Sequence, residues 1–127
     1  MAFDLLLAHL FGDYIIQSHK MATRKSISSF WCAIHVLLYG IPFAFIPDIT
    51  LLAWIIIVGT HFIIDRFSIA KYLIYFKNRL WEYQNLDECM SNFGYNKETP
   101  VWLSFFLYVV LDNTLHITIN YYAYIYL

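Results

Sequence analysis

Six ionisable side chains stand inside apolar stretches of the sequence and form three pairs with a spacing of four residues: His9/Asp13, His61/Asp65 and Asp112/His116. Four residues is just over one turn of an α-helix, so the two members of each pair share a helix face. An ionisable group inside a membrane helix costs roughly 2.5–3.5 kcal/mol on insertion scales and by default indicates function. Histidine nitrogen and carboxylate oxygen are ligands of zinc and, with more oxygen, of manganese, iron or magnesium. The pairs therefore predict a metal site.

The predicted cofactor is one or two divalent ions, with zinc favoured, held among seven candidate ligands: His9, Asp13, His35, His61, Asp65, Asp112 and His116. Two arrangements stay open. Three histidines around one zinc ion would leave a fourth position free, with the catalytic candidates Asp13, Asp65 and Asp112 orienting the rings or acting as base. Mixed ligation by histidine and aspartate would instead hold two ions. The predicted substrate-binding residues are Arg66, which could hold an anionic headgroup or phosphate, and Gln17, Asn113 and Asn120.

The segments that carry these residues are too apolar for a water-soluble protein. Of the 127 residues, 61% are hydrophobic and 13% are charged, whereas an average soluble domain is about half apolar and a quarter charged. This composition excludes a disordered chain, a disulfide-rich secreted scaffold and an ordinary soluble enzyme. A net charge of −1 excludes a basic surface for nucleic acid.

We therefore expect an all-α integral membrane bundle that forms one domain over residues 1–127. Four transmembrane helices are predicted at about 2–18, 29–46, 50–66 or longer, and 101–126. Between the third and fourth, the chain either continues as helix or bends into an amphipathic segment, followed by a cytoplasmic loop at about 77–100.

The basic residues predict the orientation of this bundle. All eight Lys and Arg residues lie in two connections, three between the first two helices and five between the third apolar segment and the fourth helix. By the positive-inside rule both connections face the cytoplasm and both termini lie on the other side. The first and third helices read His then Asp, and the fourth, which runs the opposite way, reads Asp then His. The three histidines should therefore share one layer, with the aspartates one turn nearer the cytoplasm.

Several stretches of the sequence resemble the DUF3307 family in order and spacing. They are Leu7-Ala-His-Leu-Phe-Gly-Asp13 with Gln17, His61-Phe-Ile-Ile-Asp65-Arg66, Lys77-Asn78, and Asp112-Asn-Thr-Leu-His116 with Asn120. The resemblance covers nearly the whole chain. It implies a small multi-spanning membrane protein of bacteria and their phages, and it implies no particular reaction.

The leading functional hypothesis is a membrane-embedded, metal-dependent hydrolase of the bacterial inner membrane. Its site would lie near the cytoplasmic headgroup region, so the expected substrate is a lipid or a lipid-linked, phosphorylated molecule. One alternative is an oligomeric transporter or channel for protons or divalent metal. The other is a non-catalytic bacterial or phage membrane protein that acts on envelope machinery. Membrane lipid is the expected partner, a homo-oligomer is possible, and no nucleic acid is expected.

Overall fold

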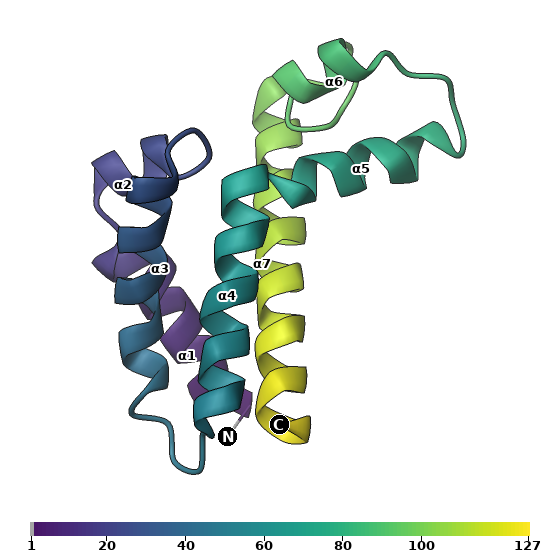
Figure 1. Cartoon of the computed structure of the whole chain (residues 1–127). Helices are drawn as coiled ribbons and strands as arrows, with labels where there is room; N and C mark the ends of the chain where they lie inside the picture. Colours follow the sequence, from purple (N-terminus) through teal and green to yellow (C-terminus); the bar gives the residue numbers. More distant parts are fainter. Residues whose placement is uncertain (1) are drawn as a thin grey trace. The chain divides into compact units, whose positions relative to one another are not determined.

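The computed structural model of the chain describes residues 2–127, and over that range it is all-α, without a strand (Figure 1). The all-α class expected from the sequence is confirmed. In chain order the elements are α1 (Ala2–Leu10), the π-helical turn η1 (Phe11–Ile16), α2 (His19–Arg24), α3 (Ser29–Phe43), α4 (Leu51–Phe67), α5 (Ile69–Arg79), α6 (Leu86–Ser91) and α7 (Val101–Tyr126).

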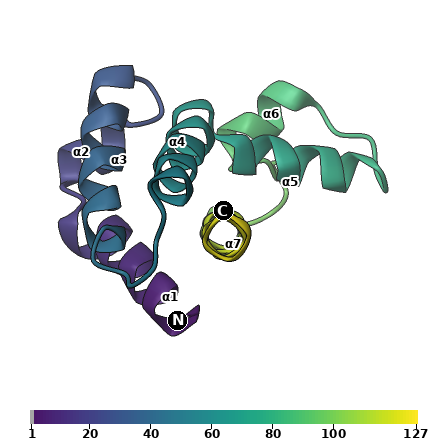
Figure 2. The same cartoon turned by 60° about the horizontal axis from the view of Figure 1, so that its bottom comes forward.

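The chain divides into two compact units. The first contains the described residues up to Phe67 together with His116–Leu127, the C-terminal part of α7. The second contains Ser68–Leu115, that is α5, α6 and the preceding part of α7. Within the first unit α3 lies beside both α4 and α2, as Figure 2 also shows. Within the second unit α5 packs on α6.

Local signals explain where the helices of the first unit begin and end. The Ser18 hydroxyl accepts a hydrogen bond from the backbone N–H of Met21 and caps α2, and the Thr50 hydroxyl accepts one from Ala53 at the start of α4. Such caps satisfy backbone groups that have no partner inside the helix. Ser68 adopts a left-handed conformation with φ of 52°, which ends α4 before α5 begins. The third predicted helix therefore breaks at Ser68 instead of running on.

The first unit buries polar side chains and exposes apolar ones. His9, His35, His61 and His116 are each at most 1% exposed. Large apolar side chains of α1, η1, α3 and α4 are in contrast exposed, among them Phe3, Ile15, Leu37, Leu51 and Ile63. Beside its buried apolar cluster the interior of the unit thus holds ionisable groups, whereas in a water-soluble domain charged and polar residues lie mostly outside.

By length and composition, α7 is the one helix among residues 2–127 that alone could cross a membrane. α4 and α5 pass the same test only if they are counted together as one broken span. α3 has 15 residues, and at about 1.5 Å per residue it is shorter than the roughly 30 Å of hydrocarbon in a bilayer. The four-helix membrane bundle therefore stays a prediction.

Candidate metal centre

Four buried side chains from three elements of the first unit converge on one point. Asp13 comes from η1, His35 from α3, and His61 and Asp65 from α4. None of the four is more than 8% exposed. We call these four residues the cage.

The two cage nitrogens lie close to each other and to both cage carboxylates. His35 Nε2 and His61 Nε2 lie 3.1 Å apart. Each of these nitrogens lies 3.1 Å from Asp65 Oδ2 and 3.3 Å from Asp13 Oδ1. Ligand atoms of a tetrahedral zinc ion, each at about 2.0 Å from the metal, lie about 3.3 Å from one another. The triangle of His35 Nε2, His61 Nε2 and Asp65 Oδ2, with Asp13 Oδ1 beside the two nitrogens, therefore has the separations of zinc ligands. His35, His61 and Asp65 form one buried group that could hold a metal ion, and Asp13 with His61 and His9 forms another.

The π-helical turn brings Asp13 to the cage. π turns inside α-helices are rare and are frequently found at functional sites. The turn ends at Gln17, whose side-chain amide donates a hydrogen bond to the carbonyl oxygen of Asp13. Its close approach to α3 depends on Gly12, because a Cβ there would lie 2.5 Å from Tyr39 Cδ2. Gly12 thus lets η1 pack directly on the Tyr39 ring.

Gly40 has the same role between α3 and α4. A Cβ at Gly40 would lie 2.7 Å from Val58 Cγ2 and 2.8 Å from Trp54 Cζ2. The indole N–H of Trp54 donates a hydrogen bond of 2.8 Å to the Gly40 carbonyl. This close contact holds the two helices that carry His35 and His61 side by side.

Two further histidines stand behind the cage carboxylates. His9 Nδ1 lies 3.6 Å from Asp13 Oδ2, and His116 Nε2 lies 3.6 Å from Asp65 Oδ1. These distances are too long for direct hydrogen bonds, but each places an imidazole beside the carboxylate oxygen that does not face the cage centre. The His61 and His116 rings also stack, with centroids 4.0 Å apart. The histidines of three helix segments therefore meet in one buried cluster.

Tyr39 connects this cluster to α7 and was not singled out from the sequence. Its hydroxyl accepts a hydrogen bond of 2.7 Å from the Asn120 side-chain amide and lies 3.0 Å from His9 Nδ1. Its ring stacks on His61, with centroids 3.8 Å apart. Tyr39 follows His35 by four residues, so the helical spacing that identified the His/Asp pairs could also have identified it.

Lys25, at the C-terminal end of α2, is the other contact that sequence reasoning missed. Its Nζ lies 2.9 Å from Asp65 Oδ2, the oxygen that also faces both cage nitrogens. The Lys25 side chain is 19% exposed, whereas that of Asp65 is 2% exposed. The ammonium therefore stands where the cage meets the exterior of the unit.

Charge accounts for the need for a cation at the cage. With both histidines neutral, the two carboxylates and Lys25 leave one net negative charge in a buried cluster. Lone pairs of two imidazole nitrogens and two carboxylate oxygens that converge on one point repel one another unless a cation or shared protons lie among them. A divalent cation would offset both carboxylate charges.

The remaining predicted site residues lie outside the cage. Arg66 donates hydrogen bonds to the Ser29 hydroxyl and the Ser26 carbonyl, at 3.0 and 2.7 Å, and so ties α4 to the turn before α3. Asp112 and Asn113 are half-buried and belong to the second unit, where the Asn113 amide bonds to a carbonyl of its own helix.

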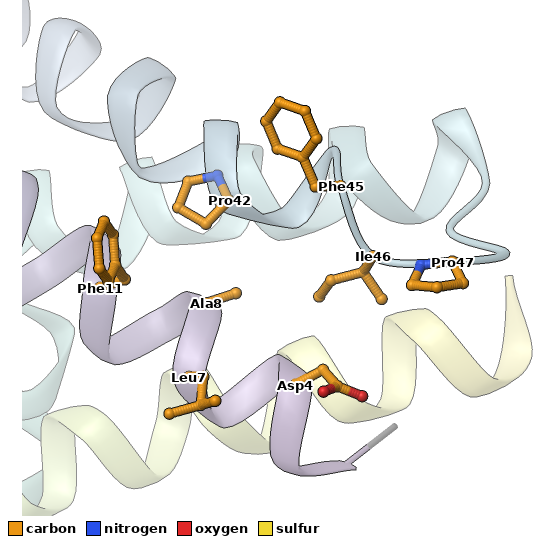
Figure 3. Close-up of a pocket in the computed structure, with 8 residues that line it drawn as sticks. All are labelled: Asp4, Leu7, Ala8, Phe11, Pro42, Phe45, Ile46 and Pro47. Atoms are coloured by element: carbon orange, nitrogen blue, oxygen red, sulfur yellow. The ribbon is translucent and has the colours of Figure 1, made fainter.

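Apolar side chains close the first unit on the side of Tyr39 that is remote from Lys25. Leu5, Phe43, Ile46, Ile57 and Ala123 form one buried cluster with Ala8 and Tyr39. A pocket of about 310 Å³ lies nearby, between α1 and the end of α3 (Figure 3). Apolar side chains and Asp4 line this pocket, and none of its lining residues belongs to the cage.

Comparison with known protein families identifies the family of the chain. The model of a family described as "Protein of unknown function (DUF3307)" matches residues 1–126, which confirms the resemblance found in the sequence. No curated protein and no solved structure gives a significant match. The protein belongs to the DUF3307 family.

Proposed function

We propose that the protein is a membrane-embedded, zinc-dependent hydrolase that acts on a lipid or a lipid-linked, phosphorylated substrate. The observation that carries this proposal is the close approach of the cage atoms: His35 Nε2, His61 Nε2 and Asp65 Oδ2 lie 3.1 Å from one another, and Asp13 Oδ1 lies 3.3 Å from both nitrogens. Three separate elements supply these atoms, so their convergence requires the fold and is not a local accident of one helix.

The donor set favours zinc over other divalent ions. Zinc prefers four ligands drawn from nitrogen, sulfur and oxygen at about 2.0–2.3 Å. Calcium takes six to eight oxygen ligands at about 2.3–2.6 Å, and magnesium takes six ligands, most of them oxygen or water. Two imidazole nitrogens with two carboxylate oxygens therefore suit zinc.

Hydrolysis requires that the ion keep one position for water or substrate, because zinc sites closed by four protein ligands are structural. His35, His61 and Asp65 form a buried group that could hold the ion without Asp13, so the fourth position would be left to water beside the Asp13 carboxylate. A metal ion at the cage supplies Lewis-acid activation of water. The Asp13 carboxylate would accept the proton of that water, and the His9 imidazole lies beside its other oxygen, at 3.6 Å.

A position in the membrane fits the surfaces of the first unit. Its exterior is apolar and its interior holds the ionisable groups, as in membrane proteins whose functional residues face the interior of the bundle. We propose a multi-pass protein of the bacterial inner membrane with both termini on the non-cytoplasmic side. The Lys25 end of the cage then faces the cytoplasmic headgroups, where phosphorylated lipids are accessible.

The apolar cluster favours a hydrolase over a channel. A conduction path needs polar or water-filled lining along its whole length. In the first unit the polar side chains continue from the cage to Tyr39 and Asn120 and then give way to Leu5, Phe43 and Ile57. The polar side chains therefore reach only the Lys25 side of the first unit, as suits an active site rather than a conduction path.

The first test is the metal content of the purified protein in detergent. We expect close to one zinc per chain in the wild type and its loss in His35→Ala, whereas His19→Ala, at an exposed position of α2, should retain it. The second test incubates zinc-loaded wild type and His35→Ala with bacterial membrane lipids and follows water-soluble phosphate compounds by ³¹P NMR. Release by the wild type alone supports the proposal. A folded wild type that takes up no zinc, or lipid turnover that is the same in both proteins, would contradict it.

A further inference from the structure

We infer that Lys25 competes with the metal ion for Asp65 and that, once displaced, its ammonium binds an oxyanion of the substrate, such as a phosphate group. This inference rests on the metal centre of the proposed function. It assigns the anion-binding role to a basic residue of the connection between α2 and α3.

The competition follows from one shared atom. Asp65 Oδ2 lies 2.9 Å from Lys25 Nζ and 3.1 Å from each cage nitrogen. An ion at the cage centre would bind this oxygen from one side while the ammonium holds it from the other. Two cations that share one carboxylate oxygen repel each other, so the divalent ion weakens the hold of Asp65 on Lys25.

The side chain that is displaced is the one able to move. Asp65, His35 and His61 are buried within the helices of the first unit. Lys25 is the C-cap residue of α2, and its flexible four-carbon side chain reaches the cage from the edge of the unit. Its partial exposure gives the ammonium a route outward that no cage ligand has.

The turn that carries Lys25 is held in place independently of Asp65. Arg66 binds the carbonyl of Ser26, the next residue after Lys25, and the hydroxyl of Ser29. The backbone of this turn therefore stays beside the end of α4 when the lysine side chain leaves Asp65. A displaced Lys25 ammonium would remain next to the metal ion, where an oxyanion can bridge the two cations.

Neighbouring basic residues are less suited to this role. The Arg66 guanidinium already holds the turn, and the Lys20 ammonium lies over the Trp31 ring at 4.6 Å from its centroid. Lysine is also a common phosphate ligand that acts as a point charge. Lys25 is therefore the residue that would distinguish an anionic substrate from a neutral one.

A purely structural ion pair makes the opposite prediction. If Lys25 only stabilised Asp65, Lys25→Gln would leave zinc affinity unchanged or lower it, and would leave anion binding unchanged. Competition predicts that Lys25→Gln binds zinc at least tenfold more tightly and binds inorganic phosphate, added to the zinc-loaded protein, at least tenfold more weakly. Lys25→Arg keeps the positive charge and should retain phosphate binding.

The experiment measures zinc affinity with a competing chelator dye and phosphate affinity by calorimetry, both on the full chain in detergent. Lys97→Gln is the control, because Lys97 pairs with Glu88 on the exposed surface of the second unit. Thermal unfolding adds a check on folding: Lys25→Gln should melt lower than wild type without zinc and at the same temperature with zinc. A wild type that binds no zinc overturns the proposed function together with this inference. Unchanged or weaker zinc binding by Lys25→Gln, or undiminished phosphate binding, overturns only the inference.

Discussion

Replacing Gly12 with alanine should weaken zinc binding by about 10- to 100-fold, the usual effect of disturbing the groups that support a metal ligand. The new Cβ would lie 2.5 Å from Tyr39 Cδ2 and 3.2 Å from Tyr39 Cα, whereas carbon atoms in contact are about 3.5–4.0 Å apart. The two groups must therefore separate by about 1 Å. Metal–ligand distances tolerate only about 0.2 Å, so a shift of η1 removes Asp13 from the cage.

The Tyr39 ring cannot absorb this overlap by moving away. It is fully buried, and its hydroxyl is held by Asn120 and His9. The η1 turn must move instead, and Asp13 is the residue next to the added methyl group. Overpacking of this kind also costs about 1–3 kcal/mol of stability.

Gly59→Ala is the matched control for this substitution. Gly59 lies in α4 two residues before His61, and a Cβ there would meet nothing within 4 Å. Gly59→Ala should therefore keep wild-type zinc affinity. Because alanine favours a helix interior over glycine by about 1 kcal/mol, this variant should unfold at a slightly higher temperature. Both variants are compared by zinc competition with a chelator dye, with helix content monitored by circular dichroism. A folded Gly12→Ala protein that binds zinc as tightly as wild type would show that the position of Asp13 does not depend on the contact of Gly12 with Tyr39.

Four further predictions concern stability and reactivity. Tyr39→Phe removes the hydroxyl that contacts His9 and Asn120 and should lower the free energy of unfolding in detergent by about 2–4 kcal/mol. Tyr122→Phe, at an exposed position, should change it by under about 0.5 kcal/mol. Equal effects of the two substitutions would contradict the hydrogen bonding of the Tyr39 hydroxyl. Gly40→Ala should destabilise by about 1–3 kcal/mol, because its Cβ overlaps α4; an unchanged melting temperature would argue against the close contact of α3 and α4. Zinc at 100 times its dissociation constant should stabilise the wild type by about 2.7 kcal/mol, and a melting temperature independent of zinc would count against the site. Burial raises the pKa of the Cys89 thiol, so its thiolate fraction at neutral pH is below that of an ordinary cysteine. Maleimide labelling should therefore be slow until the pH is raised. Rapid labelling at pH 7 would show that Cys89 in α6 is accessible to solvent.

Spacing along the helices made part of the site predictable. The pairs His9/Asp13 and His61/Asp65 each lie on one helix face, and the reversed order in the last helix placed His116 in the same histidine cluster. These inferences need only helical periodicity and chain direction. The four-residue spacing also reaches from His35 to Tyr39, so the sequence held that signal as well.

Three features around the cage could not be predicted from the sequence in the same way. Lys25 meets Asp65 across 40 positions of sequence, and no local pattern links a residue at the end of a short helix to that carboxylate. The π turn at Asp13 was equally hidden, because the sequence around it fits an ordinary α-helix. Ser68 adopts a left-handed conformation although serine has no strong preference for it, so the break between α4 and α5 depends on tertiary structure.

The most direct test of the central claim is zinc X-ray absorption spectroscopy of the purified, zinc-loaded protein in detergent. We expect an inner shell of nitrogen and oxygen atoms at about 2.0 Å, four in number or three with one water, and the outer signal of two imidazole rings from His35 and His61. His35→Ala should lose one imidazole from that signal. A sulfur shell at about 2.3 Å, or a six-coordinate oxygen shell without imidazole, would rule out a metal centre at the cage.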